Sequence, residues 1–248
     1  MAIRYENAPI REAMIDLRVD LPTGFTIEQV EALHQRVIDQ YPGRLKRVHV
    51  EGAVTVGAEP GFTSKQTETG FVFQSSDGLQ VCQFRLDGFS FSRLRPYKDW
   101  RSLSDEARRL WAMYKEELAP LRITRIAVRY INQIDIPLPA VDYKDYFRTT
   151  PEVSPDLPQG LSGFFMQLQF PLELRDGYMV LTQTAVAAPK PDMHSVILDL
   201  DAHYDGPEVA SDEEVWARLE ELRDVKNHFF EGSITERTRE LFGERIHS

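Results

Sequence analysis

The clearest hydrophobic pattern in the chain is a period of two between Arg122 and Pro137. Apolar residues occupy every second position, as expected of a strand that buries one face. The predicted core face consists of Ile126, Val128, Tyr130, Ile134 and Ile136. Asn132 falls on the same face and needs a hydrogen-bonding partner, because an unpaired buried amide costs about 1–3 kcal/mol. The stretch therefore predicts a sheet with one core side and one polar side.

Six further stretches have the pattern of β-strands, and two of them contain an Asp-Gly pair that predicts a tight turn. These two are predicted hairpins at 71–86 and 164–186, with turns at Asp77–Gly78 and Asp176–Gly177. Single strands are predicted at 12–21, 48–56, 89–94 and 194–204. Residues 57–69 have no such pattern and are predicted to be a loop.

Helices are predicted where a capping residue precedes an apolar stripe of helical period. Thr26 opens a helix that runs to Tyr41, Ser102 opens one that ends before Pro120, and Ser211 opens a long helix through Phe229. Shorter helical segments are predicted at 143–147 and from Ser233 to Gly243.

The two halves of the chain, residues 1–120 and 121–248, share one order of elements. Each half is predicted to contain a strand, a connecting segment, an Asp-Gly hairpin, a second strand and a long capped helix, in that order. We therefore expect a single domain of the α+β class over residues 1–248, built from two pseudo-repeats. Its large antiparallel sheet is expected to be strongly curved, with the two long helices on one face. The uncovered face is where a groove for a ligand is expected.

Composition and charge narrow the class of protein. The chain is 42% hydrophobic and 27% charged, which is typical of globular domains. It lacks an apolar run that could span a membrane, and its N-terminus lacks the apolar core of a signal peptide, so we expect a cytoplasmic location. The single cysteine, Cys82, allows no internal disulfide and is expected in the core. The net charge of −10 argues against nonspecific binding to nucleic acid.

Positive charge is nevertheless concentrated in one region. Residues 85–129 contain 11 Lys or Arg and 6 Asp or Glu, whereas the rest of the chain is strongly acidic. The candidate ligand-binding residues are Arg85, Arg93, Arg125, Arg129 and Gln133. Arg125 and Arg129 share the polar face of the central strand, roughly 13 Å apart at a rise of about 3.3 Å per residue. An anionic ligand would suit them; the alternative is that they neutralise the protein's own acidic elements.

The sequence identifies no catalytic residue and no particular cofactor. Asp199, Asp201 and His203 share one side of a predicted strand, so an enzyme could use them as acid, base or metal ligands. Any strand with an acidic outer face has the same pattern, and we predict no metal site. A nucleophile elbow, a glycine-rich phosphate loop and a zinc-protease motif are all missing from the sequence.

Four blocks of sequence carry a resemblance: 7–13, 91–100, 129–134 and 227–235. Together they resemble a family of uncharacterised, sporadically distributed prokaryotic proteins of about this length, defined only by a sequence model. The resemblance implies no reaction, and its patchy distribution is typical of mobile or defence-related loci. Glu12 and Arg129 match its blocks, and we expect them to form a buried ion pair across neighbouring strands.

We therefore predict a soluble binding or assembly protein, with a protein partner or a second copy of itself, from a mobile or defence-related (toxin–antitoxin-like) locus. The alternative is an enzyme or sensor for an anionic, nucleotide-like or RNA ligand held by an arginine-lined sheet face.

Overall fold

The computed structural model describes residues 3–55, 61–139, 142–173, 176–206, 211–243 and 245–247. Within these residues the main element is an open antiparallel sheet of nine strands in the order β3-β4-β5-β6-β2-β7-β10-β9-β8. Its strands are β2 (Ile10–Asp20), β3 (Gly43–Thr55), β4 (Gly61–Gln74), β5 (Gln80–Arg85), β6 (Gly88–Leu94), β7 (Arg122–Pro137), β8 (Phe165–Pro171), β9 (Gly177–Val186) and β10 (Met193–Tyr204). A separate pair consists of β1 (Ile3–Tyr5) and β11 (Arg245–His247).

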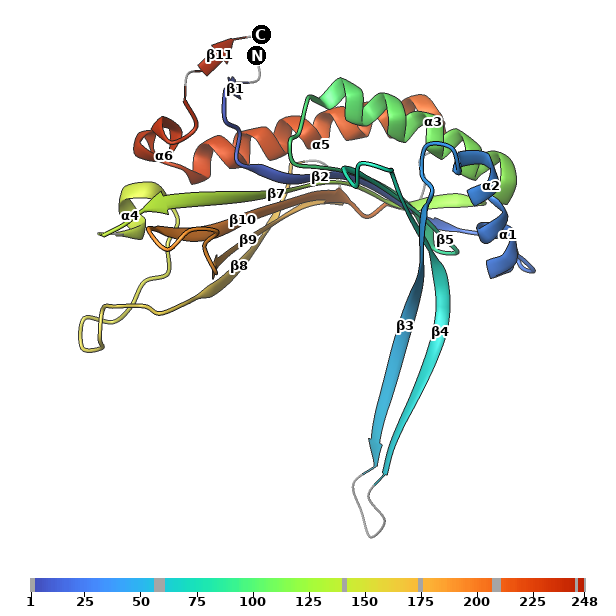
Figure 1. Cartoon of the computed structure of the whole chain (residues 1–248), viewed down its shortest axis with the longest axis horizontal. Helices are drawn as coiled ribbons and strands as arrows, with labels where there is room; N and C mark the ends of the chain where they lie inside the picture. The colour runs from blue at the N-terminus through green and yellow to red at the C-terminus, as the bar shows by residue number, and fades with distance from the viewer. Residues whose placement is uncertain are drawn as a thin grey trace.

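Two long antiparallel helices, α3 (Trp100–Leu118) and α5 (Asp212–Ser233), cover one face of the sheet (Figure 1). The Trp100 indole of α3 donates to Glu220 on α5 at 2.5 Å. The short helices are α1 (Ile27–Ala32), α2 (His34–Val37), α4 (Tyr143–Tyr146) and α6 (Glu236–Glu240). The predicted α+β class, the antiparallel sheet and the two helices on one face are therefore confirmed. None of the described helices has the length and apolar character needed to span a membrane.

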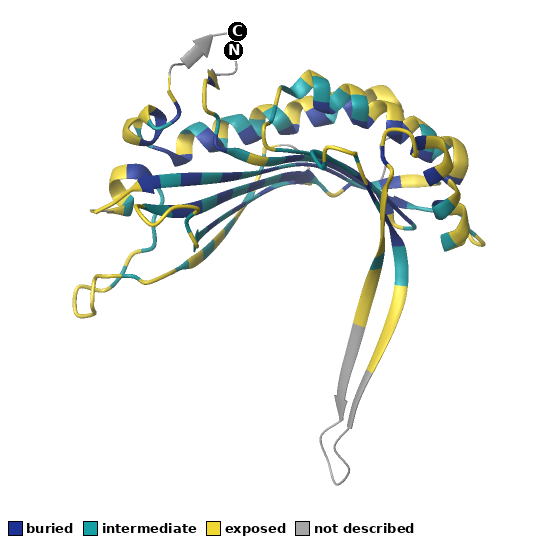
Figure 2. Ribbon diagram, viewed as in Figure 1, coloured by how far each residue is buried: buried dark blue, intermediate teal, exposed yellow. Residues whose placement is uncertain are grey.

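The core lies between the sheet and these two helices, as Figure 2 shows by its band of buried residues. All residues of the predicted core face of β7 are buried. Asn132 is buried with them, and its side-chain amide donates to the carbonyl of Leu198 at 3.0 Å. The predicted stripe of α3 is also buried: Leu103, Ala107, Leu110, Trp111, Tyr114 and Leu118.

The order of strands is symmetric about the pair β2–β7. Each of these first strands lies beside the last strand of its own half, β6 or β10, followed outward by β5 or β9 and then β4 or β8. A duplicated unit would produce this arrangement, with β3 as an additional edge strand. The division into two repeats itself stays a prediction.

Three predictions about element boundaries are wrong. Residues 61–69 of the predicted loop belong to β4, because they pair with β3 in an arm that projects away from the helices (Figure 1); residues 57–60 lie outside the described part. The predicted helix from Thr26 to Tyr41 breaks at Leu33, whose carbonyl accepts a short-range bond from the Arg36 N–H. The capping residues of α3 and α6 are Asp99 and Thr235.

Lys226 on α5 is buried over the ring of Tyr130, with its Nζ 3.8 Å from the ring centre. Burial, together with the nearby charge of Arg223, lowers the Lys226 pKa from 10.5 to about 7. The unfolded chain therefore binds one more proton than the folded chain between these two pH values. The free energy of unfolding should then rise with pH over this window.

We expect Lys226→Met to stabilise the protein at pH 6 and to remove this pH dependence. The contribution of Lys226 between pH 6 and pH 10 is about 4 kcal/mol, since one pKa unit corresponds to about 1.4 kcal/mol. Urea unfolding at several pH values measures it, with the exposed Lys144→Met as control. Identical pH dependence in wild type and Lys226→Met would show that the buried amine is not the cause.

Candidate functional site

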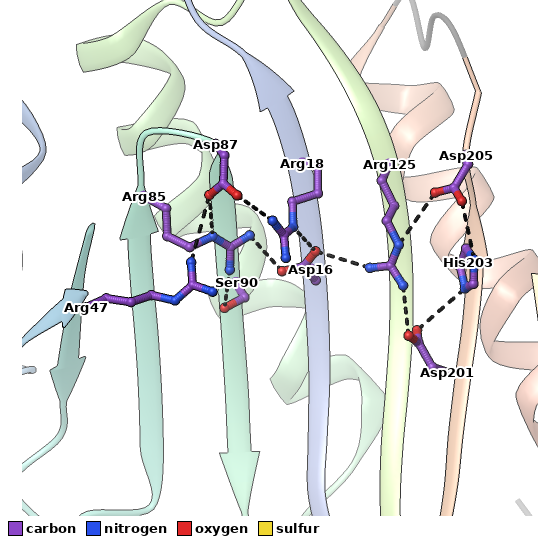
Figure 3. Close-up of polar contacts among 10 residues, drawn as sticks. All are labelled: Asp16, Arg18, Arg47, Arg85, Asp87, Ser90, Arg125, Asp201, His203 and Asp205. Atoms are coloured by element: carbon purple, nitrogen blue, oxygen red, sulfur yellow. Dashed lines mark hydrogen bonds and ion pairs between the residues drawn. The ribbon is translucent and has the colours of Figure 1, made fainter. Parts of the chain in front are cut away.

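Charged side chains crowd the open face, which is the face of the sheet that α3 and α5 leave uncovered. The alternation of β2, β7 and β10 sends apolar residues to the helices and polar residues to this face. Figure 3 shows ten of these polar residues, joined across six strands, the turn after β5 and the residue that follows β10: Asp16, Arg18, Arg47, Arg85, Asp87, Ser90, Arg125, Asp201, His203 and Asp205. We call this group the arginine–aspartate network.

Arg85 and Asp16 form the buried centre of the network. The side chain of Arg85 is 3% exposed and that of Asp16 is 10% exposed. Arg85 Nη2 donates to Asp16 Oδ2 at 2.8 Å, and Nε donates to Asp87 Oδ1 at 3.0 Å. Arg85 Nη1 lies 3.4 Å from Ser90 Oγ. An ion pair this well enclosed is difficult to break, because removal of either partner leaves an uncompensated buried charge.

Two glycines make room for Arg85. Gly70 and Gly88 are its neighbours on the flanking strands. A Cβ at Gly70 would lie 2.9 Å from Arg85 Cα, and a Cβ at Gly88 would lie 3.0 Å from Arg85 Nη2. Gly88 also has a φ of +148°, which side chains other than hydrogen rarely allow. The local sequence is therefore fitted to the position of this guanidinium.

The arginines of β7 pair diagonally with carboxylates on the next strand, β10. Arg129 donates to Asp199 at 2.5 and 2.9 Å, and Arg125 Nη2 donates to Asp201 at 2.8 Å. Arg125 Nη1 also lies 3.3 Å from Asp16 Oδ1. The hydrogen bond to Asp199 is the main cause that raises the pKa of Arg129. The predicted pair of Glu12 with Arg129 is wrong, because Asp199 takes that place; Glu12 acts on Arg129 only at longer range.

Arg18 and Arg47 complete the network, and sequence reasoning missed both. Arg18 pairs with Asp87 and lies 3.2 Å from Asp16. Arg47 is more weakly held, since the carboxylate oxygen nearest to it among the described residues, on Asp87, is 4.0 Å away. Partial burial, followed by the positive charge of Arg85, lowers the pKa of Arg47. Arg47 is thus a cation in surroundings that are already positive.

The network lines a hollow of about 580 Å³ on the open face. Its lining contains five arginines and three aspartates: Arg18, Arg47, Arg85, Arg125, Arg129, Asp16, Asp201 and Asp205. Met14, Gln83, Ser90, Thr124 and Ala127 form the rest. The lining thus has two more arginines than aspartates, although the whole chain carries a net charge of −10. Asp87 and Asp199, which pair with Arg85 and Arg129, lie outside the lining. A hollow of this size accommodates a small ligand or one group of a larger ligand.

The acidic end of the network lies on β10. His203 Nε2 is 3.4 Å from Asp205, and its Nδ1 is 3.9 Å from Asp201 Oδ1. Nδ1 and Oδ1 are both buried without a hydrogen-bond partner among the described residues. Over the same residues the structure contains no group of three or more His, Cys, Asp or Glu side chains that could hold a metal ion.

The predicted site residues separate into two places. Arg85, Arg125 and Arg129 line the open-face hollow. Gln133 shares the face but lies farther along β7, where it donates to Asp135 at 3.0 Å. Arg93 lies on the opposite, helix side of the sheet, since residues 89, 91 and 93 of β6 point to the same face and Phe89 and Phe91 belong to the core. The missed residue Arg18 could have been found, because it alternates with the core residues of β2.

Comparison of the chain with models of known protein families gives no match, and comparison with curated proteins gives none either. The family resemblance therefore stays a prediction.

Proposed function

We propose that this chain is a binding protein that takes the phosphate group of a nucleotide-like ligand at Arg18 and Arg47 on the open face. The observation that carries the proposal is the shared use of Asp87. Three guanidinium groups, those of Arg18, Arg47 and Arg85, gather around this one carboxylate. Asp16 is shared in the same way by Arg18, Arg85 and Arg125. Arg125 is also paired with Asp201 and Asp205. Asp16 and Asp87 are therefore left to serve the three arginines Arg18, Arg47 and Arg85, which leaves one positive charge in excess at this end of the network for an incoming anion.

The arginines differ in how well they could reach a ligand. Arg85 is enclosed and fully engaged, so its role is to hold the network together. The side chains of Arg18 and Arg47 are 37% and 38% exposed. Arg47 has no carboxylate oxygen within hydrogen-bonding distance among the described residues, so its N–H groups are the ones most available to phosphate oxygens. A dianion would offset the mutual repulsion of these cations.

An enzyme is the less favoured alternative. The acid, base or metal ligands of that alternative are Asp199, Asp201 and His203, and both aspartates bind an arginine of β7. Catalysis at this face would first require those ion pairs to open. We therefore favour a binding protein over an enzyme.

Assembly with a protein partner or a second copy stays a prediction. Strand β3 is an edge of the sheet and exposes Leu45, Val48 and Val50. Exposed apolar residues on an edge strand favour association with another chain. Native mass spectrometry of protein purified from its own host tests this: a dimer or a retained partner chain supports assembly, and a lone monomer argues against it.

Thermal unfolding with inorganic phosphate tests the proposed site. At about 10 mM phosphate and constant ionic strength set with sodium chloride, we expect the melting temperature to rise by about 2–4 °C. Arg47→Met should lose this shift. Arg122→Met is the matched control, because Arg122 lies on β7 in an exposed pair with Asp20 and outside the hollow. An equal shift in Arg47→Met and wild type would refute binding at Arg47.

A further inference from the structure

A second hollow, of about 460 Å³, lies on the helix side of the sheet, away from the arginine–aspartate network. It is bounded by the end of α2, the turn between β4 and β5, the end of β6 and the first half of α3. Its lining residues are Gln40, Tyr41, Ser75, Ser76, Asp77, Gln80, Arg93 and Glu106. Most of these offer hydroxyl or amide groups, and Arg93 is the one cation among the lining residues.

The Nε–H group of Arg93 points to an unmet need in this hollow. Its Nε is buried and has no hydrogen-bond acceptor among the described residues. Its backbone is fixed between Ala13 on β2 and Gln80 on β5, so the side chain must project from the end of β6 toward α3. A buried guanidinium N–H that lacks an acceptor is costly. The position therefore favours a ligand that supplies one.

The two carboxylates of the hollow are already engaged elsewhere. Glu106 accepts two hydrogen bonds from Arg109, at 2.7 and 2.9 Å, and one from the Tyr41 hydroxyl at 2.7 Å. Asp77 is held within its turn by the Ser75 hydroxyl and the Leu79 N–H. Arg93 acts on both carboxylates only as a more distant charge. Neither one neutralises Arg93 directly.

We infer that this hollow binds the carboxylate of a small polar acid, with Arg93 as its anchor. A planar carboxylate matches the fork of a guanidinium group, and its two oxygens can accept parallel N–H bonds. Asp77 and Glu106 add negative charge to the lining and interact with Arg93 through space, so a monoanion is repelled less here than a dianion such as phosphate. Ser76 and the side-chain amide of Gln80 would then bind hydroxyl or amide groups of the ligand, because the Tyr41 and Ser75 hydroxyls already donate to Glu106 and Asp77.

Nuclear magnetic resonance of the full chain with ¹⁵N-labelled arginine tests this inference directly. The Arg93 Nε–H signal is assigned by its loss in Arg93→Lys. Lactate is the probe, and its uncharged amide, lactamide, is the matched control. We expect lactate to shift the Arg93 signal saturably, with a dissociation constant of about 1–10 mM, as is typical of a small fragment. Lactamide should leave the signal unchanged.

The variants separate this hollow from the open face. Arg93→Met should abolish lactate binding, measured on the side-chain amide of Gln80, and Arg47→Met should leave it intact. Arg93→Lys keeps the positive charge but lacks the planar guanidinium group, so it should weaken lactate binding about tenfold. This variant replaces Arg93→Met in the test if Arg93→Met does not fold. An Arg93 signal that does not respond to lactate up to about 50 mM would overturn the inference. Tighter binding of inorganic phosphate than of lactate at Arg93 would overturn the choice of a carboxylate.

Discussion

Replacement of Asp16 by Asn is expected to destabilise the folded protein by about 3–5 kcal/mol, because it leaves Arg85 buried without its main counter-charge. Arg85 is 3% exposed, so water cannot replace the lost carboxylate. Asp87 remains, but it is 52% exposed and already shared with Arg18 and Arg47. The change preserves the size of the side chain, so the loss of stability is due to the missing negative charge and not to altered packing.

Urea unfolding at pH 7 measures this effect. Asp20→Asn is the matched control, because Asp20 lies on the same strand in an exposed ion pair with Arg122. Exposed pairs contribute about 0–1 kcal/mol, so the control should remain close to wild type. If Asp16→Asn lost no more stability than Asp20→Asn, the network would not depend on a buried ion pair.

Gly88→Ala should destabilise the protein by at least about 3 kcal/mol, through strain and overlap together. Gly88 has a φ of +148°, and a Cβ there would lie 2.2 Å from the Leu17 carbonyl oxygen. The overlap is with the backbone of the neighbouring strand, which can relieve it only by moving β2 relative to β6. The Asp16–Arg85 pair would be pulled apart by the same movement.

Gly160→Ala provides the control for Gly88→Ala. A Cβ at Gly160 meets no atom within 4 Å, and no positive φ is involved. Thermal unfolding of both variants should give a large loss for Gly88→Ala and almost none for Gly160→Ala. Equal melting temperatures for the two variants would mean that the backbone at Gly88 relaxes without cost.

Most of the fold could be predicted from stretches in which apolar residues recur at a regular spacing. The central strand is found at Arg122–Pro137 as predicted, because its alternation is sustained over the whole stretch. The stripe of α3 was equally clear, since an amphipathic helix repeats its apolar residues at a fixed spacing. Both elements face the core, where burial enforces the pattern.

Elements without a buried face could not be predicted in the same way. Residues 64–67 of β4 are exposed, so no alternation of apolar residues marks them as a strand. They are held by ladder pairing with β3, which the sequence does not reveal. The start of α3 was missed for a related reason, since both Asp99 and Ser102 are good capping residues and only the geometry selects Asp99.

The sequence predicted that arginines would line the open face, but it did not identify all the residues of the site or their partners. Alternation placed Arg125 and Arg129 on the open face correctly. Their partners could not be known, because Asp199 pairs with Arg129 through the register of β10 against β7. Arg93 was grouped with the wrong face, although its spacing of two from Phe91 and four from Phe89 places it on the core side of β6.

The most direct test of anion binding at the open face is to locate the anion itself. Crystals soaked in tungstate, a tetrahedral dianion that resembles phosphate, would reveal its position through anomalous scattering. We expect tungstate beside Arg18 and Arg47 within the open-face hollow, and we expect it to be absent from crystals of Arg47→Met. Wild-type crystals whose open face stays empty, or variant crystals that bind tungstate there equally well, would contradict the proposed function.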